Sequence, residues 1–83
     1  MHSFGNDELI DNARRATATD CHLMLEHRKR HGTLTNADTS DAAALLDRAS
    51  SAETAELSDT FVTAAAVILL ADDAGAAAWD AVR

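Results

Sequence analysis

The chain has 83 residues and a formal net charge of −7, and its apolar residues are mostly alanine. This length allows one domain, and a negative charge of this size repels nucleic acid and favours basic partners. One cysteine excludes an internal disulfide, and the longest apolar stretch, residues 61–71, is too short to span a membrane. We therefore expect a single cytoplasmic domain over residues 1–83, with no cofactor.

The first predicted helix runs from about residue 7 to about residue 31, with Asn6 as its N-cap and residues 1–6 as a flexible end. Gly32 is suited to end this helix, because glycine readily adopts the left-handed conformation. At 100° per residue the apolar side chains fall on one arc. Thr17 and Asp20 interrupt this arc. We interpret them as rim positions, with a buried polar contact as the alternative.

The remaining helices follow a polar loop that ends near residue 40. Residues 39–41 can cap a second helix, and Ser58 is the expected N-cap of a third. Residues 61–71 of the third helix are apolar on nearly every side, so this helix is either central to a bundle or shared with another chain. Gly75 either ends it, leaving a short C-terminal helix, or lies within one continuous helix.

Together these elements predict an all-α fold. The sequence contains no proline, and its β-branched residues never alternate as they would in a strand. We expect a small bundle of three to four helices, built around the long N-terminal helix and the apolar C-terminal helix.

Two histidines are weak candidates for a metal site. His27 and His31 are four residues apart and share one face of a helix. A transition-metal site normally needs three or four ligands, and no other Cys or His supplies an evident third. The dipole of a helix C-terminus accounts for the basic run 27–31 without a metal. We therefore predict no metal, with a helical metal-binding protein that uses His27 and His31 as a further alternative function.

No catalytic constellation is present in the sequence. Cys21 and His22 cannot form a catalytic dyad, because adjacent side chains on a helix point about 100° apart. Cys21 lies on the apolar arc, which is typical of a small core residue. The sequence contains no glycine-rich phosphate loop, GxSxG motif or HExxH motif. We predict that the protein is not an enzyme.

Part of the chain carries four short strings in order: Leu23-Met24-Leu25, then Gly32, then residues 43–50, then Leu57-Ser58-Asp59. Within residues 14–70 they resemble the three-helix ANTAR domain of RNA-binding antiterminators. The first loop is several residues longer than in that family, and acids replace the basic residues of its RNA surface. The resemblance implies an alternative function, a degenerate antiterminator-like RNA-binding domain. Its basic residues here would be Arg14, Arg15 and residues 28–30.

The charge is unevenly distributed. Residues 1–34 carry five acids and five bases, whereas residues 35–83 carry nine acids and two bases. An acidic face steers association with a basic surface, and the thin core favours burial against another protein or in a homodimer. We predict a protein-binding module, for example a regulator or inhibitor of a nucleic-acid-binding protein. The expected steering acids and anchors are Glu53, Glu56, Leu57, Asp59, Phe61, Asp72, Asp73 and Trp79.

Overall fold

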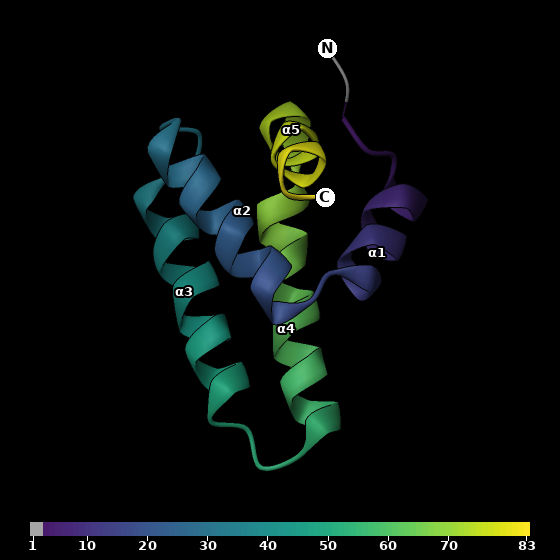
Figure 1. Cartoon of the computed structure of the whole chain (residues 1–83), viewed down its shortest axis with the longest axis vertical. Coiled ribbons are helices and arrows are strands. Elements are labelled where there is room, and N and C mark those ends of the chain that lie inside the picture. The colour runs from purple at the N-terminus through teal and green to yellow at the C-terminus, as the bar shows by residue number, and fades with distance from the viewer. Residues whose placement is uncertain (1–2) are drawn as a thin grey trace.

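Five α-helices build the structure (Figure 1). The computed structural model describes residues 3–83, and this part of the chain contains no strand. The helices are α1 (Asn6–Arg15), α2 (Ala18–Arg30), α3 (Asn36–Ser50), α4 (Ala55–Leu70) and α5 (Asp72–Val82). The predicted all-α class is confirmed, but the predicted number of three to four helices is wrong.

The predicted long N-terminal helix is in fact two helices, α1 and α2, which are separated at Ala16 and Thr17. The Thr17 hydroxyl accepts a hydrogen bond from the Asp20 N–H, and the Asp20 carboxylate accepts one from the Thr17 N–H, both at 3.0 Å. This capping box satisfies N–H groups that a helix start leaves unpaired, so a new helix begins here. Thr17 and Asp20 interrupt the apolar arc because they cap α2. Gly32, at φ 64°, follows the last turn of α2 and ends it, as predicted.

Both α3 and α4 begin earlier than predicted, because a threonine caps each of them. The Thr35 hydroxyl accepts a hydrogen bond from the N–H three residues further on, at 3.0 Å. The Thr54 hydroxyl does the same at 3.1 Å. Threonine is a good N-cap, so the backbone is already helical at residues 39–41 and at Ser58, the positions predicted for the caps.

The chain turns sharply between α4 and α5, which are bent by 116° relative to each other. The break falls at Ala71 and Asp72, and Gly75 lies inside α5, so neither predicted alternative for Gly75 is correct. Within residues 3–83 no single helix is long and apolar enough to cross a membrane. The α4 and α5 helices reach that length and composition only as this bent pair.

The α4 helix is the centre of the bundle, since it contacts each of the other four helices. Figure 1 shows α3 antiparallel beside α4, α1 on its other side, and α5 where α4 ends. The apolar pattern of α4 therefore reflects a central position, one of the two predicted alternatives. Its outward side still carries apolar residues, because Leu57 and Val67 are 44% and 39% exposed.

Alanine supplies half of the buried apolar residues, so few large side chains fill the core. The radius of gyration is 11.7 Å, close to the value of about 12 Å expected for a compact domain of this length. The largest fully buried side chain belongs to Arg28 rather than to an apolar residue. A charged side chain in this position requires an account of where its hydrogen bonds go.

The predicted flexible end, residues 1–6, is only partly described. Met1 and His2 lie outside the described residues. Phe4 is partly buried and packs against the core, and α1 already begins at Asn6.

Candidate functional site

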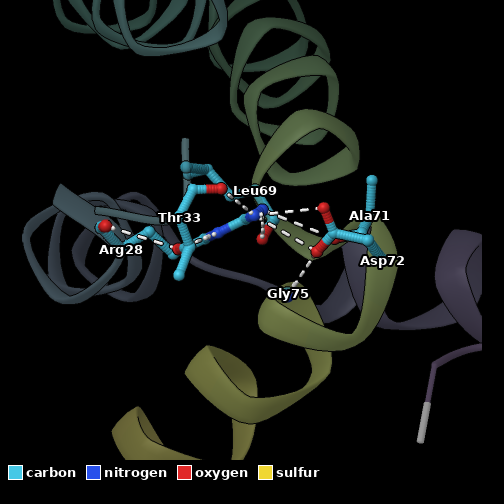
Figure 2. A network of polar contacts seen from close by, with 6 residues as sticks. All are labelled: Arg28, Thr33, Leu69, Ala71, Asp72 and Gly75. Atoms are coloured by element: carbon cyan, nitrogen blue, oxygen red, sulfur yellow. Dashed lines mark hydrogen bonds and ion pairs between the residues drawn. The ribbon is translucent and has the colours of Figure 1, made fainter. Parts of the chain in front are cut away.

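The buried arginine joins α2 to the break between α4 and α5 (Figure 2). Arg28 is 1% exposed and has four partners. Its Nε donates a hydrogen bond to Thr33 Oγ1 at 3.0 Å. Its Nη1 donates to the carbonyl oxygens of Leu69 and Ala71, at 3.2 and 3.4 Å. Its Nη2 donates to the Thr33 carbonyl oxygen at 2.8 Å and to both carboxylate oxygens of Asp72, at 3.1 and 3.2 Å. These contacts use all five N–H groups of the guanidinium.

The guanidinium caps the C-terminal end of α4 from outside that helix. The last carbonyls of a helix have no partner within it, and the helix dipole makes this end negative. Arg28 donates to two such carbonyls, those of Leu69 and Ala71, and places a positive charge beside them. We infer a structural role for Arg28, because it satisfies groups that the 116° bend leaves unpaired.

Asp72 completes this junction and starts α5. Its φ is 65°, a left-handed conformation that aspartate tolerates better than most residues. Its Oδ1 accepts a hydrogen bond from the Gly75 N–H at 3.0 Å while the same carboxylate pairs with Arg28. Gly75 is buried so tightly that a Cβ there would overlap the Leu70 carbonyl group and lie 2.8 Å from the Leu70 Cα.

This network removes Arg28 from the predicted basic surface. All of its donors bind within the chain, so Arg28 is not available to a phosphate group. The sequence did contain a signal for this role. Arg28 lies four and seven residues after Met24 and Cys21, which places it on the buried stripe of α2. The interpretation of residues 27–31 as one basic cluster obscured this spacing.

His27 and His31 do lie together, as their spacing predicts. Their ring centroids are 4.4 Å apart, with the planes tilted by 38°. Within residues 3–83, no group of three or more His, Cys, Asp or Glu side chains is placed to hold a metal ion. The pKa of His27 is lowered by burial and also by the nearby His31, Arg30 and Arg28. Its Nδ1 is buried without a hydrogen-bond partner in the described chain.

We expect the free energy of unfolding to fall as the pH is lowered from about 7 to about 5. The unfolded chain has a His27 pKa near the ordinary value of about 6.5, above that of the folded chain, so it binds the proton more readily. The loss of unfolding free energy begins as the pH falls through the pKa that His27 has in the unfolded chain. It levels off below the pKa that His27 has in the folded chain. Urea unfolding across this range tests it. His27→Gln should flatten the slope and His22→Gln, at an exposed position, should not; equal slopes in all three proteins would contradict this prediction.

Cys21 is held as an unreactive thiol. Its Sγ is buried and donates to the Val62 carbonyl at 3.7 Å. Burial, and then the neighbouring Asp20, raise the pKa of Cys21 to about 12. A nucleophilic cysteine requires a low pKa and access to its substrate, so this geometry is typical of a core residue.

The predicted acidic face is divided between the two ends of α4. Glu53 lies in the turn between α3 and α4, and Glu56 and Asp59 lie in the first two turns of α4 with the partly exposed Leu57; all three acids are exposed. Asp72 and Asp73 lie beyond the other end of α4. The helix between them has 16 residues, which corresponds to about 24 Å. The structure therefore does not bring these five acids together.

The predicted aromatic anchors belong more to the core than to the surface. Trp79 is 9% exposed and packs in the core, and the Arg83 guanidinium lies 4.5 Å from its ring centroid. Arg83 also donates to Asp20 at 3.0 Å, which ties the C-terminal end of α5 to α2. Phe61 is half-buried against the core. Leu57 is the predicted anchor with the greatest exposure.

Two surface hollows lie along α4. One of about 420 Å³ lies between α4 and the junction of α1 and α2; its lining includes Arg14, Arg15, Ser58, Asp59 and Thr63. The other, of about 310 Å³, lies between α3 and α4 and is lined by Asp41, Ala44, Leu45, Arg48 and Ile68. We call the second hollow the α3–α4 groove.

Comparison of the chain with protein-family models, with curated proteins and with solved structures finds no match. The resemblance to the ANTAR domain therefore rests on its four short strings alone. The five helices also exceed the three that this resemblance implies.

Proposed function

We propose that this chain is a non-enzymatic helical module that binds a basic surface of another protein through the end of the bundle where the turn after α3 leads into α4. We call this region the acidic tip and define it as Glu53, Glu56, Leu57 and Asp59. One observation carries the proposal. The three carboxylates are exposed, form no ion pair within residues 3–83, and lie at the same end of the bundle as a leucine that is 44% exposed.

The chemistry of the acidic tip suits a basic protein surface. Exposed charges without partners contribute little to stability, but they steer association and raise its rate. Leu57 supplies an apolar contact, and covering its exposed part contributes about 1 kcal/mol. The function therefore depends on the charge of three residues and on one anchor.

RNA binding is the alternative, and the positions of the arginines make it the weaker proposal. Arg14 and Arg15 are exposed beside the hollow of about 420 Å³, but Asp59 lines the same hollow. Arg28 is used within the fold. The other basic residues that the RNA-binding alternative would use are Lys29 and Arg30. They lie in the last turn of a different helix, α2.

Charge reversal tests the proposal. The combined change Glu53→Lys, Glu56→Lys and Asp59→Lys should reduce capture of partner proteins from the native host by about tenfold or more, because three attractive contacts become repulsive. The matched control is Asp7→Lys, Asp11→Lys and Asp80→Lys, which changes the net charge equally at exposed positions outside the tip. Capture is quantified by mass spectrometry at low and at high salt.

The outcomes separate the two candidate functions. The proposal requires a captured protein that is lost with the tip reversal, retained with the control and weakened by salt. Unchanged capture by the tip variant, or equal loss in both variants, would contradict the proposal. RNA recovered with the wild-type chain and lost on the change Arg14→Glu with Arg15→Glu would favour the alternative.

A further inference from the structure

We propose that the α3–α4 groove is the contact surface of a symmetric homodimer. This inference goes beyond the protein-binding function above and uses a different surface. The groove is apolar at its centre, where Leu45 and Ile68 are half-buried and Ala44 is exposed. Half-buried apolar side chains in an open groove are the feature that a second chain would cover.

The apolar surface continues along α4 beyond the groove itself. Ala64 and Ile68 are four residues apart, so they share one side of this helix. Both side chains are half-buried. The side of α4 that borders the groove is therefore apolar for about one turn.

The charges on the groove indicate that its occupant is a second copy of the same chain. Asp41 and Arg48 both line the groove, and neither forms an ion pair within residues 3–83. They are seven residues apart on α3, about 10 Å along the helix, which is too far for a direct contact between them. The groove thus carries one negative and one positive side chain on either side of Ala44 and Leu45.

A two-fold axis through this point makes the surface complementary to itself. Rotation about an axis perpendicular to α3, near Ala44 and Leu45, places a second α3 antiparallel to the first. Asp41 of each copy then faces Arg48 of the other, and the pair forms twice. Ala44 is small enough to let the two helices approach closely at the axis. The net charge of −7 opposes this association weakly, because salt screens charges outside the contact over about 8 Å.

The arrangement leaves the acidic tip accessible. Because the two α3 helices are antiparallel, the two tips point towards opposite ends of the dimer, and both remain free to bind. The dimer is therefore a separate property from the binding of a basic partner, and each can fail without the other.

A charge-swap experiment tests the dimer directly. Analytical ultracentrifugation of the wild-type chain should show a concentration-dependent species of twice the chain mass of 8.8 kDa. Asp41→Arg, and separately Arg48→Asp, should each raise the dimer dissociation constant by about tenfold, because each places like charges opposite each other twice. The double variant Asp41→Arg with Arg48→Asp should restore the wild-type dissociation constant.

Restoration by the double variant requires contact between two chains, since the two residues do not contact each other within one chain. A wild-type chain that stays monomeric at about 1 mM would overturn the proposal. So would a double variant that dissociates as readily as the single ones. If the single variants simply failed to fold, circular dichroism would reveal it, and crosslinking at position 44 would then decide.

Crosslinking gives an independent measurement. Ala44→Cys places a thiol beside the proposed axis, where a short bismaleimide should join two chains. Ala43→Cys is the matched control, because Ala43 is also exposed on α3 but does not line the groove. Cys21 is buried and contributes no background. Equal crosslinking at both positions, or none at position 44, would overturn the proposal.

Discussion

Replacing Arg28 with methionine should lower the free energy of unfolding by about 3–5 kcal/mol, although methionine fills much of the same volume. The loss comes from the groups that Arg28 satisfies. Without it, the carbonyls of Leu69, Ala71 and Thr33 lose a hydrogen-bond donor, and each buried carbonyl left unpaired costs about 1–3 kcal/mol. Water reaches part of the site, since the Asp72 side chain is 63% exposed, so these costs do not add in full.

Urea unfolding followed by circular dichroism measures this effect. A domain of this size has a total stability of about 4–12 kcal/mol, so this loss is a large share of the total and shifts the unfolding midpoint measurably. Arg28→Lys should lose less unfolding free energy than Arg28→Met, because lysine keeps the positive charge. It should still lose some, because one ammonium nitrogen replaces the three nitrogens of the guanidinium group. Arg30→Met, at an exposed position two residues along α2, is the control and should change stability by no more than about 0.5 kcal/mol. A similar, small effect at both arginines would contradict the role assigned to Arg28.

The helical class was predictable because it depends on local features that repeat along the chain. The helix boundaries were predicted less well, because competing caps lie within one or two turns of each other. The capping pattern of Thr17 and Asp20 is visible in the sequence, but the apolar arc that continues across it favoured one long helix. At Thr35 and Thr54 the cap lies just upstream of the predicted one.

The junction between α4 and α5 was not predictable from local features. Its position depends on contacts from α2, more than forty residues earlier in the sequence, and on the left-handed conformation of Asp72. Gly75 was expected either to end the third helix or to lie within one continuous helix, and neither is its role. It is required where a helix packs against the preceding backbone, not where a helix ends.

Glu53, Glu56 and Asp59 are exposed, as is usual for charged side chains without partners. Their separation from Asp72 and Asp73 was missed. Distance along the sequence conceals the fact that α4 is one continuous helix and holds the two groups at its opposite ends.

Replacing Gly75 with alanine should lower the free energy of unfolding by about 3 kcal/mol, because the new Cβ collides with the backbone of Leu70. A collision with backbone atoms cannot be relieved by rotating a side chain, so α5 must shift against α4. The other two glycines are matched controls. Gly32→Ala should cost about 1 kcal/mol, because φ is 64° there but nothing lies within 4 Å. Gly5→Ala should cost less than about 1 kcal/mol, since its Cβ meets only the end of the Glu8 side chain, at 3.9 Å.

The order of the three glycine variants tests the geometry, whatever the absolute stability of the protein. A loss at Gly75 no greater than that at Gly32 would contradict the close packing of α5 on α4. The same geometry couples Gly75 to Arg28, because a shift of α5 moves Asp72 and Ala71, which are two of the partners of Arg28. The combined variant Gly75→Ala with Arg28→Met should therefore lose less stability than the sum of the single losses, by about 1 kcal/mol or more. Strict additivity would mean that the guanidinium and the helix contact stabilise the fold independently, and the junction would then not act as one unit.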